Sequence, residues 1–191
     1  MTPDDTEVLA FWFGAPPLAV RSEWFRKDPA FDEAIRARFG ALVDDAIDGR
    51  LPVPDPSAGP EAVLARLILL DQFPRNLFRG QARAFAGDAQ ARTLALGLID
   101  SGAEQALHPL QRWFVYLPLE HAEDLALQDR SVALFAALAA QAPGFDSALD
   151  YAERHRDVIR RFGRFPHRNA ALGRESTADE EAYLAIPGSG F

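Results

Sequence analysis

The 191-residue sequence contains no cysteine and no apolar run that approaches the roughly 20 residues of a membrane-spanning helix. The lack of cysteine excludes a disulfide framework and thiolate chemistry. Residues 1–7 are acidic, whereas a secretory signal peptide begins with a basic region. We therefore expect a cytoplasmic protein that makes no contact with a membrane.

Positive charge is also scarce. Lysine and arginine together number 20 against 28 aspartates and glutamates, so the formal net charge is -8. A general nucleic-acid binder needs a basic face to neutralise phosphates, so we expect no nucleic-acid partner. The hydrophobic content of 48% is typical of a soluble globular protein. The length suits one core, which predicts a single domain over residues 1–191, with an irregular segment 163–191 packed on its body.

Several chemical signatures are missing as well. The chain has no His-Glu-x-x-His or Glu-x-x-His motif and no calcium-binding loop, which predicts no metal. It has no glycine-rich phosphate loop and no Gly-x-Ser-x-Gly elbow, so we expect no cofactor and no serine nucleophile. A metal site assembled from His121, His155 and His167 remains a geometric alternative.

Helical patterns fill most of the chain, and no stretch shows sustained alternation of apolar and polar residues. The sequence therefore predicts an all-α protein of seven to nine helices arranged as antiparallel hairpins. Local signals place several helix starts, at Thr2-Pro3, Asp28-Pro29, Pro60 and Thr177. Periodicity leaves open whether the helices form a compact bundle or a short superhelix.

Three further helices bear on function. Asp88 is expected to cap one helix, and a long helix is expected from about Glu120 to Gln141. A third should run from Phe145 to Phe162, with Tyr151 and His155 facing inward. Pro118 should break or kink the helix that precedes the long one.

The most unusual stretch is the basic segment 160–174, which contains five arginines and a histidine without a carboxylate. Such a segment needs anionic partners. These could be internal carboxylates, with Asp71, Glu120 and Asp124 as the expected ones, or a carboxylate or phosphate ligand held by planar guanidinium groups. The carboxylate at Phe191 could itself occupy such a site.

A similar turn occurs earlier, because Phe-Pro-Arg-Asn at 73–76 resembles Phe-Pro-His-Arg-Asn at 165–169. Proline lacks an amide hydrogen and disfavours a helical conformation in the residue before it, so both helices should end nearby. The aspartate just before the first turn, Asp71, falls on the apolar stripe of its helix. We therefore expect Asp71 to be buried with a cationic or hydrogen-bonding partner.

Histidines offer candidate acid–base groups. His121 shares a helix side with Asp124 and Gln128 if that helix is continuous, and a carboxylate could then orient its imidazole. His155 is expected to be at least half buried, either as a core histidine with one hydrogen bond or beside another histidine.

Three motifs together resemble a known family: LDQFPRNLFRG at 70–80, LPLEHAEDL at 117–125 and GRFPHRNAALGR at 163–174. They are similar to the bacterial family named domain of unknown function 924, and the similarity extends over nearly the whole chain. The resemblance implies an all-helical fold, as a tetratricopeptide-like right-handed array or a compact bundle. It implies no activity and assigns no catalytic residue.

The leading hypothesis is a protein that binds a small anionic molecule or a peptide in a groove lined by the two proline turns. Its ligand-binding residues would be Asp71, Arg75, Asn76, Arg79, Glu120, His155, Arg164, Arg168 and Asn169. The alternative is an enzyme in which His121 or His167 acts as acid or base, Asp71 or Asp124 orients it, and arginines hold an anionic substrate. A third interpretation makes these residues purely structural.

Overall fold

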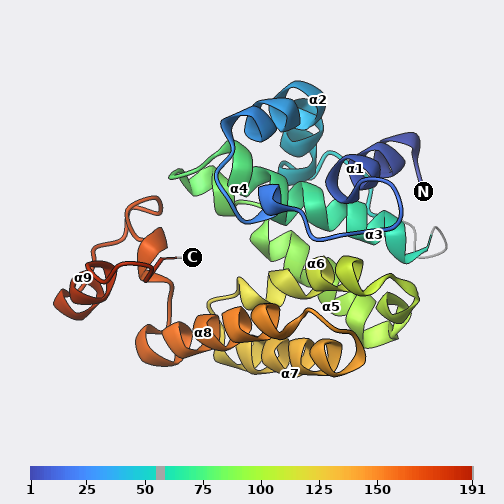
Figure 1. Ribbon diagram of the computed structural model, residues 1–191. Helices are drawn as coiled ribbons and strands as arrows, with labels where there is room; N and C mark the ends of the chain where they lie inside the picture. Colours follow the sequence, from blue (N-terminus) through green and yellow to red (C-terminus); the bar gives the residue numbers. More distant parts are fainter. Residues whose placement is uncertain (55–58, 191) are drawn as a thin grey trace. The chain divides into compact units, whose positions relative to one another are not determined.

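The computed structural model describes residues 1–54 and 59–190, and these residues form helices and loops without a β-strand (Figure 1). The chain divides into two compact units. Unit 1 comprises Met1–Arg79 and Arg83–Pro118, and unit 2 comprises Gly80–Ala82 and Leu119–Phe191. The all-α prediction is confirmed. Within the described part of the chain, no helix combines the length and the apolar character needed to cross a membrane.

Unit 1 is built from helices that begin at the local signals expected from the sequence. Thr2 and Asp5 form a capping box at the first helix, and Asp28 accepts hydrogen bonds from two amides of the second. The helix after Asp88 is not capped by that residue, because its N-cap is Gly87 and the Asp88 carboxylate binds Arg75. The elements of unit 1 are α1 (Pro3–Phe13), α2 (Pro29–Ile47), α3 (Pro60–Leu67), α4 (Phe73–Leu77), α5 (Asp88–Ser101) and α6 (Pro109–Glu120), whose last two residues belong to unit 2.

Aromatic rings fill the core of unit 1. The fully buried Trp12 ring of α1 stacks on Trp24 at 6.0 Å between centroids, and its edge contacts are with Phe73 and Phe114 at 5.6 and 5.5 Å. Aromatic pairs of this kind stabilise a core beyond the burial of their area. Helix α3 packs against both α1 and α5 beneath these rings.

The first proline turn does not end its helix. Residues Ile68–Gln72 form a π-helical turn, in which the Phe73 amide donates to the Ile68 carbonyl five residues earlier, and α4 then begins at Phe73 with Pro74 as its second residue. A proline ring inside a helix collides with the carbonyl four residues before it, here that of Leu70. That carbonyl instead lies so close to Gly87 that a Cβ on the glycine would be 2.3 Å from its oxygen. The wider π-helical turn accommodates Pro74. The sequence pattern did not predict this turn.

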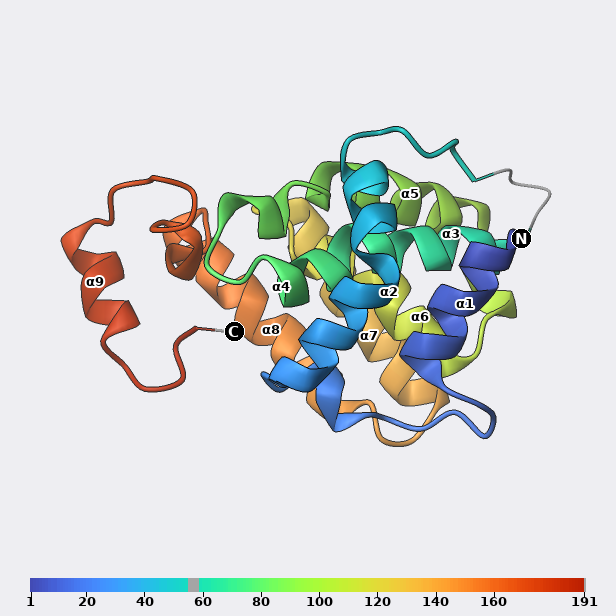
Figure 2. The ribbon, with the colours of Figure 1, turned by 90° about the horizontal axis from the view of Figure 1, so that it is seen from above.

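Unit 2 is organised on an antiparallel pair, α7 (Leu125–Gln141) and α8 (Asp146–Phe162), which lie side by side in Figures 1 and 2. A left-handed Gly163 ends α8, a single 3₁₀ turn covers Pro166–Arg168, and α9 (Ala178–Leu184) begins at the predicted capping box of Thr177 and Glu180.

The long helix expected from about Glu120 to Gln141 is α7, but it begins five residues later than expected, at Leu125. Helix α6 passes through Pro118 and ends at Glu120, and Asp124 then caps α7 by accepting a hydrogen bond from the Leu127 amide at 3.0 Å. The buried Gln128 closes the link, because its Nε2 donates to the carbonyls of Glu120 and Ala122. His121 therefore lies in a loop and shares no helix face with Asp124 or Gln128.

Candidate functional site

The polar side chains of the first proline turn, in unit 1, form ion pairs and hydrogen bonds with carboxylates of the same unit. Asp71 is 1% exposed and lies 3.2 Å from Nη1 of Arg75, as expected for a buried aspartate. Arg75 also donates two hydrogen bonds to Asp88, at 2.9 and 3.1 Å. Burial alone would lower the pKa of Arg75, but Asp71 and Asp88 raise it above its usual value.

The other two polar residues of this turn share one carboxylate. Asn76 is buried and donates to Asp32 at 2.7 Å, and Arg79 donates two hydrogen bonds to the same aspartate at 3.0 and 3.1 Å. All four candidate residues of the first turn are thus held by internal hydrogen bonds or ion pairs. These interactions account for them structurally.

Two clamps hold the second proline turn, in unit 2. In the first clamp, Arg164 donates to both carboxylate oxygens of the buried Glu180, at 2.6 and 2.8 Å. Asn169 donates to Ser176 at 3.0 Å and to Glu180 at 3.3 Å. The hydrogen bonds from Arg164 are the main reason that the pKa of Glu180 is lowered to about 2, and the Thr177 amide lowers it further.

In the second clamp, Glu123 fixes the backbone of Phe165. The Phe165 amide donates to Glu123 at 2.8 Å, while Arg174 donates two hydrogen bonds to Glu123 and one to the Phe165 carbonyl. Burial would raise the pKa of Glu123, but the hydrogen bonds from Arg174 and Phe165 lower it. The partners of these arginines are therefore Glu180 and Glu123, not the Asp71, Glu120 and Asp124 expected from the sequence.

Around the clamped Phe165 gather three histidines and an arginine, here called the histidine cluster: His121, His155, His167 and Arg168. The buried Phe165 ring meets His155 edge-on at 5.5 Å and lies 5.6 Å from His167, between centroids. The His121 and His155 rings are 6.2 Å apart, and the Arg168 guanidinium lies 4.4 Å from the centre of the Phe165 ring. Residues far apart in the sequence thus form one cationic and aromatic group.

His155 is the buried member of the cluster, with 5% exposure. Its Nδ1 is 2.8 Å from the Tyr151 carbonyl and 3.1 Å from Oε1 of Glu120, which is also buried. Because two acceptors face Nδ1, this nitrogen carries the proton and Nε2 is the basic atom. Burial lowers the pKa of His155 well below its usual value, and positive charge on His121, Arg168 and His167 lowers it further, although the hydrogen bond with the Tyr151 carbonyl opposes this shift. The imidazole is therefore neutral at neutral pH.

The structure places the proposed catalytic residues differently from what the sequence led us to expect. His121 and His167 are half-buried and belong to the cluster, whereas Asp124 is exposed and serves as the α7 cap. Glu120, which was not proposed as an orienting carboxylate, lies 3.1 Å from Nδ1 of His155. Tyr151, expected to face inward, is 50% exposed. Sequence reasoning gave no role to Phe165 or Glu123, since nothing local signals their long-range partners.

Within the described ranges, no group of three or more histidine and carboxylate side chains is arranged to hold a metal ion. The expected role of the Phe191 carboxylate lies outside the described residues. The groove expected from the sequence would be lined by both proline turns. The first turn belongs to unit 1 and the second to unit 2.

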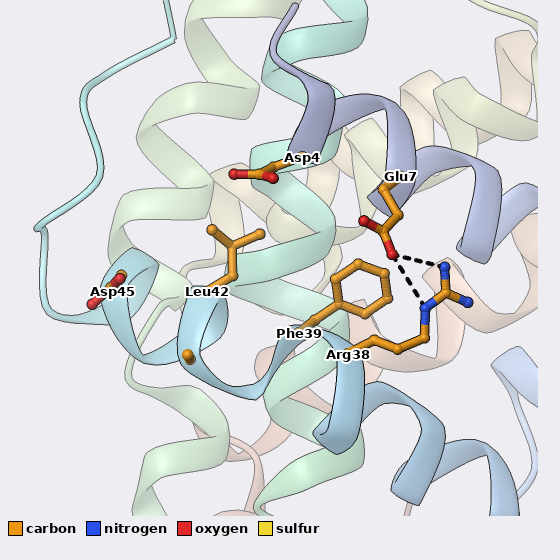
Figure 3. A pocket seen from close by; sticks show the side chains of 7 residues that line it. Asp4, Glu7, Arg38, Phe39, Leu42 and Asp45 are labelled. Carbon is orange, nitrogen blue, oxygen red and sulfur yellow. Dashed lines mark hydrogen bonds and ion pairs between the residues drawn. The ribbon is translucent and has the colours of Figure 1, made fainter.

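A shallow hollow of about 270 Å³ lies in unit 1 between α1 and α2 (Figure 3). Its side chains mix apolar, acidic and basic groups, and they include Asp4, Glu7, Arg38, Phe39, Leu42 and Asp45. Arg38 already donates to Glu7 at 2.9 Å and lies over the rings of Phe11 and Phe39. Glu7 and Arg38 are thus paired with each other, and Asp45 is bound to Arg50.

Comparison with known proteins places the chain in one family. The model of the family described as "Bacterial protein of unknown function (DUF924)" matches residues 8–188. A solved structure of the protein of unknown function ATU0120 from Agrobacterium tumefaciens is similar at 42% identity and a TM-score of 0.77, covering 95% of this chain and 96% of that one. A search of curated proteins found no match. This chain therefore belongs to the DUF924 family of bacterial proteins.

Proposed function

We propose that unit 2 binds a small molecule bearing a carboxylate or phosphate at the histidine cluster. The observation that carries the proposal is the convergence of His167 and the Arg168 guanidinium on the Phe165 ring, with His121 beside the neutral His155. His121, His167 and Arg168 can donate N–H groups to such an anion, whereas Nε2 of His155 is an acceptor.

The local charge supports an anionic ligand even though the chain as a whole carries a net charge of -8. His121, Arg168 and His167 all place positive potential at His155. In a partly water-excluded site, such potential attracts an anion more strongly than it does at an exposed surface.

The residues that surround the histidine cluster also support anion binding. Arg164 and Arg174 are each bound in forked geometry to a glutamate, so they hold the turn rather than a ligand. The buried Arg168 lies over the Phe165 ring, and the Glu123 clamp holds the amide and, through Arg174, the carbonyl of Phe165. A site whose groups are held in advance loses less entropy when a ligand binds.

The test is a titration of the protein with inorganic phosphate, citrate, acetate and a short peptide with a free carboxylate, followed by NMR of the histidine ring protons. The chain has four histidines, and His108 belongs to unit 1, so its signal is an internal control. At least one anion should shift the signals of His121, His155 and His167 without shifting that of His108.

Arg168→Gln should weaken this binding by about ten-fold or more, because hydrogen bonds to charged groups contribute about 1.5–3 kcal/mol. The matched control is Arg160→Gln, which removes the same charge from an exposed arginine paired with Asp157 and Asp129. Arg168→Lys keeps the charge but loses the planar fork, and circular dichroism checks that each variant is folded. Wild-type protein that binds no anion, or equal binding by Arg168→Gln and Arg160→Gln, would refute the proposal.

One observation favours a second function, acid–base catalysis on the bound anion. Glu120 and the Tyr151 carbonyl hold His155 in the tautomer whose Nε2 can accept a proton. The anion that binds most tightly is incubated with wild type and with His155→Gln and analysed by mass spectrometry. Conversion by wild type alone supports catalysis, and an unchanged anion in both samples leaves binding as the function.

A further inference from the structure

The segment after α9 turns and runs back from the end of that helix (Figures 1 and 2). The Ser189 amide donates to the Ile186 carbonyl at 3.1 Å, and Gly188 has a φ of 79°. Proline at the second position and a left-handed glycine at the third are typical of a type II turn, here formed by Pro187 and Gly188. The Tyr183 hydroxyl then donates to the Ser189 carbonyl at 2.5 Å and fastens the turn to α9.

The turn brings the chain to the histidine cluster. A Cβ placed on Gly190 would lie 3.7 Å from the Cβ of His167, so the backbone of this glycine lies beside that histidine. The half-buried His167 thus lies next to Gly190, the last described residue of this segment.

Residues 186–190 are attached to the rest of unit 2 by few interactions. Ile186 is 56% exposed, and Pro187, Gly188 and Gly190 are exposed as well. Tyr183, whose ring contacts Phe162 at 5.2 Å between centroids, supplies the main side-chain attachment. Segments with few buried apolar contacts open locally at a small fraction of the cost of global unfolding.

We propose that residues 186–190 form a strap that covers the His167 side of the histidine cluster and lowers its affinity for anions. The inference rests on the proposed function and adds regulation to the same site. An anion that binds only when the strap is open has its affinity reduced by the fraction of molecules in the open state. Loosening the strap should therefore tighten anion binding.

The test uses the full-length chain and the titrations with phosphate and citrate. Tyr183→Phe removes the hydroxyl that fastens the strap and keeps the ring against Phe162. One ordinary hydrogen bond changes such an equilibrium by about five-fold, so the affinity should rise by up to about five-fold. The matched control is Ser147→Ala, which removes a hydroxyl from an exposed side chain of the same unit and should leave the affinity unchanged.

Gly188→Ala provides a second way to loosen the strap, because a side chain is disfavoured at a φ of 79°. It should raise the affinity as Tyr183→Phe does, and both variants should shift the His167 ring signal before any anion is added. The Ser147→Ala protein should show the wild-type His167 signal.

The outcomes separate the two proposals. If wild type binds an anion and both strap variants bind it equally or more weakly, the strap is refuted and the proposed function stands. If neither wild type nor variants bind any of the anions, the proposed function fails and the strap has no ligand to regulate.

Discussion

Arg75 provides a direct test of the buried ion pair in unit 1. Its guanidinium lies 3.2 Å from the fully buried Asp71 and forms two hydrogen bonds with Asp88. Arg75→Gln leaves Asp71 as a buried carboxylate without its cation. The matched control is Arg79→Gln, which removes the same group from an arginine that is 38% exposed and paired with Asp32.

The losses in free energy of unfolding caused by Arg75→Gln and Arg79→Gln should differ several-fold. Removing one partner of a buried ion pair typically lowers the free energy of unfolding by about 3–5 kcal/mol, whereas an exposed pair contributes at most about 1 kcal/mol. We expect a loss of about 3 kcal/mol for Arg75→Gln, the lower end, because glutamine can still donate a hydrogen bond to Asp71. With a urea dependence of about 1.5 kcal/mol per M, the unfolding midpoint should fall by about 2 M.

Tryptophan fluorescence is the assay of choice, because Trp12, Trp24 and Trp113 are the three tryptophans of the chain and all lie in unit 1. Asp71→Asn in the Arg75→Gln background should recover part of the loss, since it removes the unpaired charge. Equal midpoints for Arg75→Gln and Arg79→Gln would refute the reasoning, as would a double variant less stable than Arg75→Gln alone.

Two further predictions concern single contacts. Gly87→Ala should lower the free energy of unfolding of unit 1 by about 2 kcal/mol in the same fluorescence assay, because its Cβ would lie 2.3 Å from the Leu70 carbonyl oxygen. The control is Gly97→Ala, in the open middle of α5, which should raise the free energy of unfolding by up to about 1 kcal/mol. Equal effects of the two substitutions would contradict the prediction. Arg164→Gln should raise the pKa of Glu180 from about 2 toward 4.5, measured by NMR of its carboxyl carbon. Because the folded pKa is lowered, Glu180 stabilises wild type above pH 4.5 and loses this effect as the pH falls toward 2, so an unchanged pH dependence in Arg164→Gln would argue against the clamp.

The helical fold and many helix ends followed from local sequence signals. The capping boxes at Thr2 and Thr177 and the Asp28-Pro29 start act within one helical turn, so no distant residue is needed to predict them. The burial of Asp71 followed from helical periodicity for the same reason.

Local rules failed where a long-range contact intervened. The π-helical turn at Ile68–Gln72 accommodates Pro74, and the displaced Leu70 carbonyl needs the bare glycine at position 87. The break between α6 and α7 depends likewise on Gln128, which satisfies the carbonyls left open at the end of α6. Neither contact is visible in a short sequence window.

The sequence by itself determined an all-helical chain and marked 160–174 as a segment that needs negative charge. Only the tertiary structure decided which carboxylates supply that charge, Glu180 for Arg164 and Glu123 for Arg174. It also decided that His121, His155 and His167 meet around Phe165. The physical reason is that helix formation depends on neighbours within a few residues, whereas ion pairs and ring contacts depend on packing between segments that are tens of residues apart.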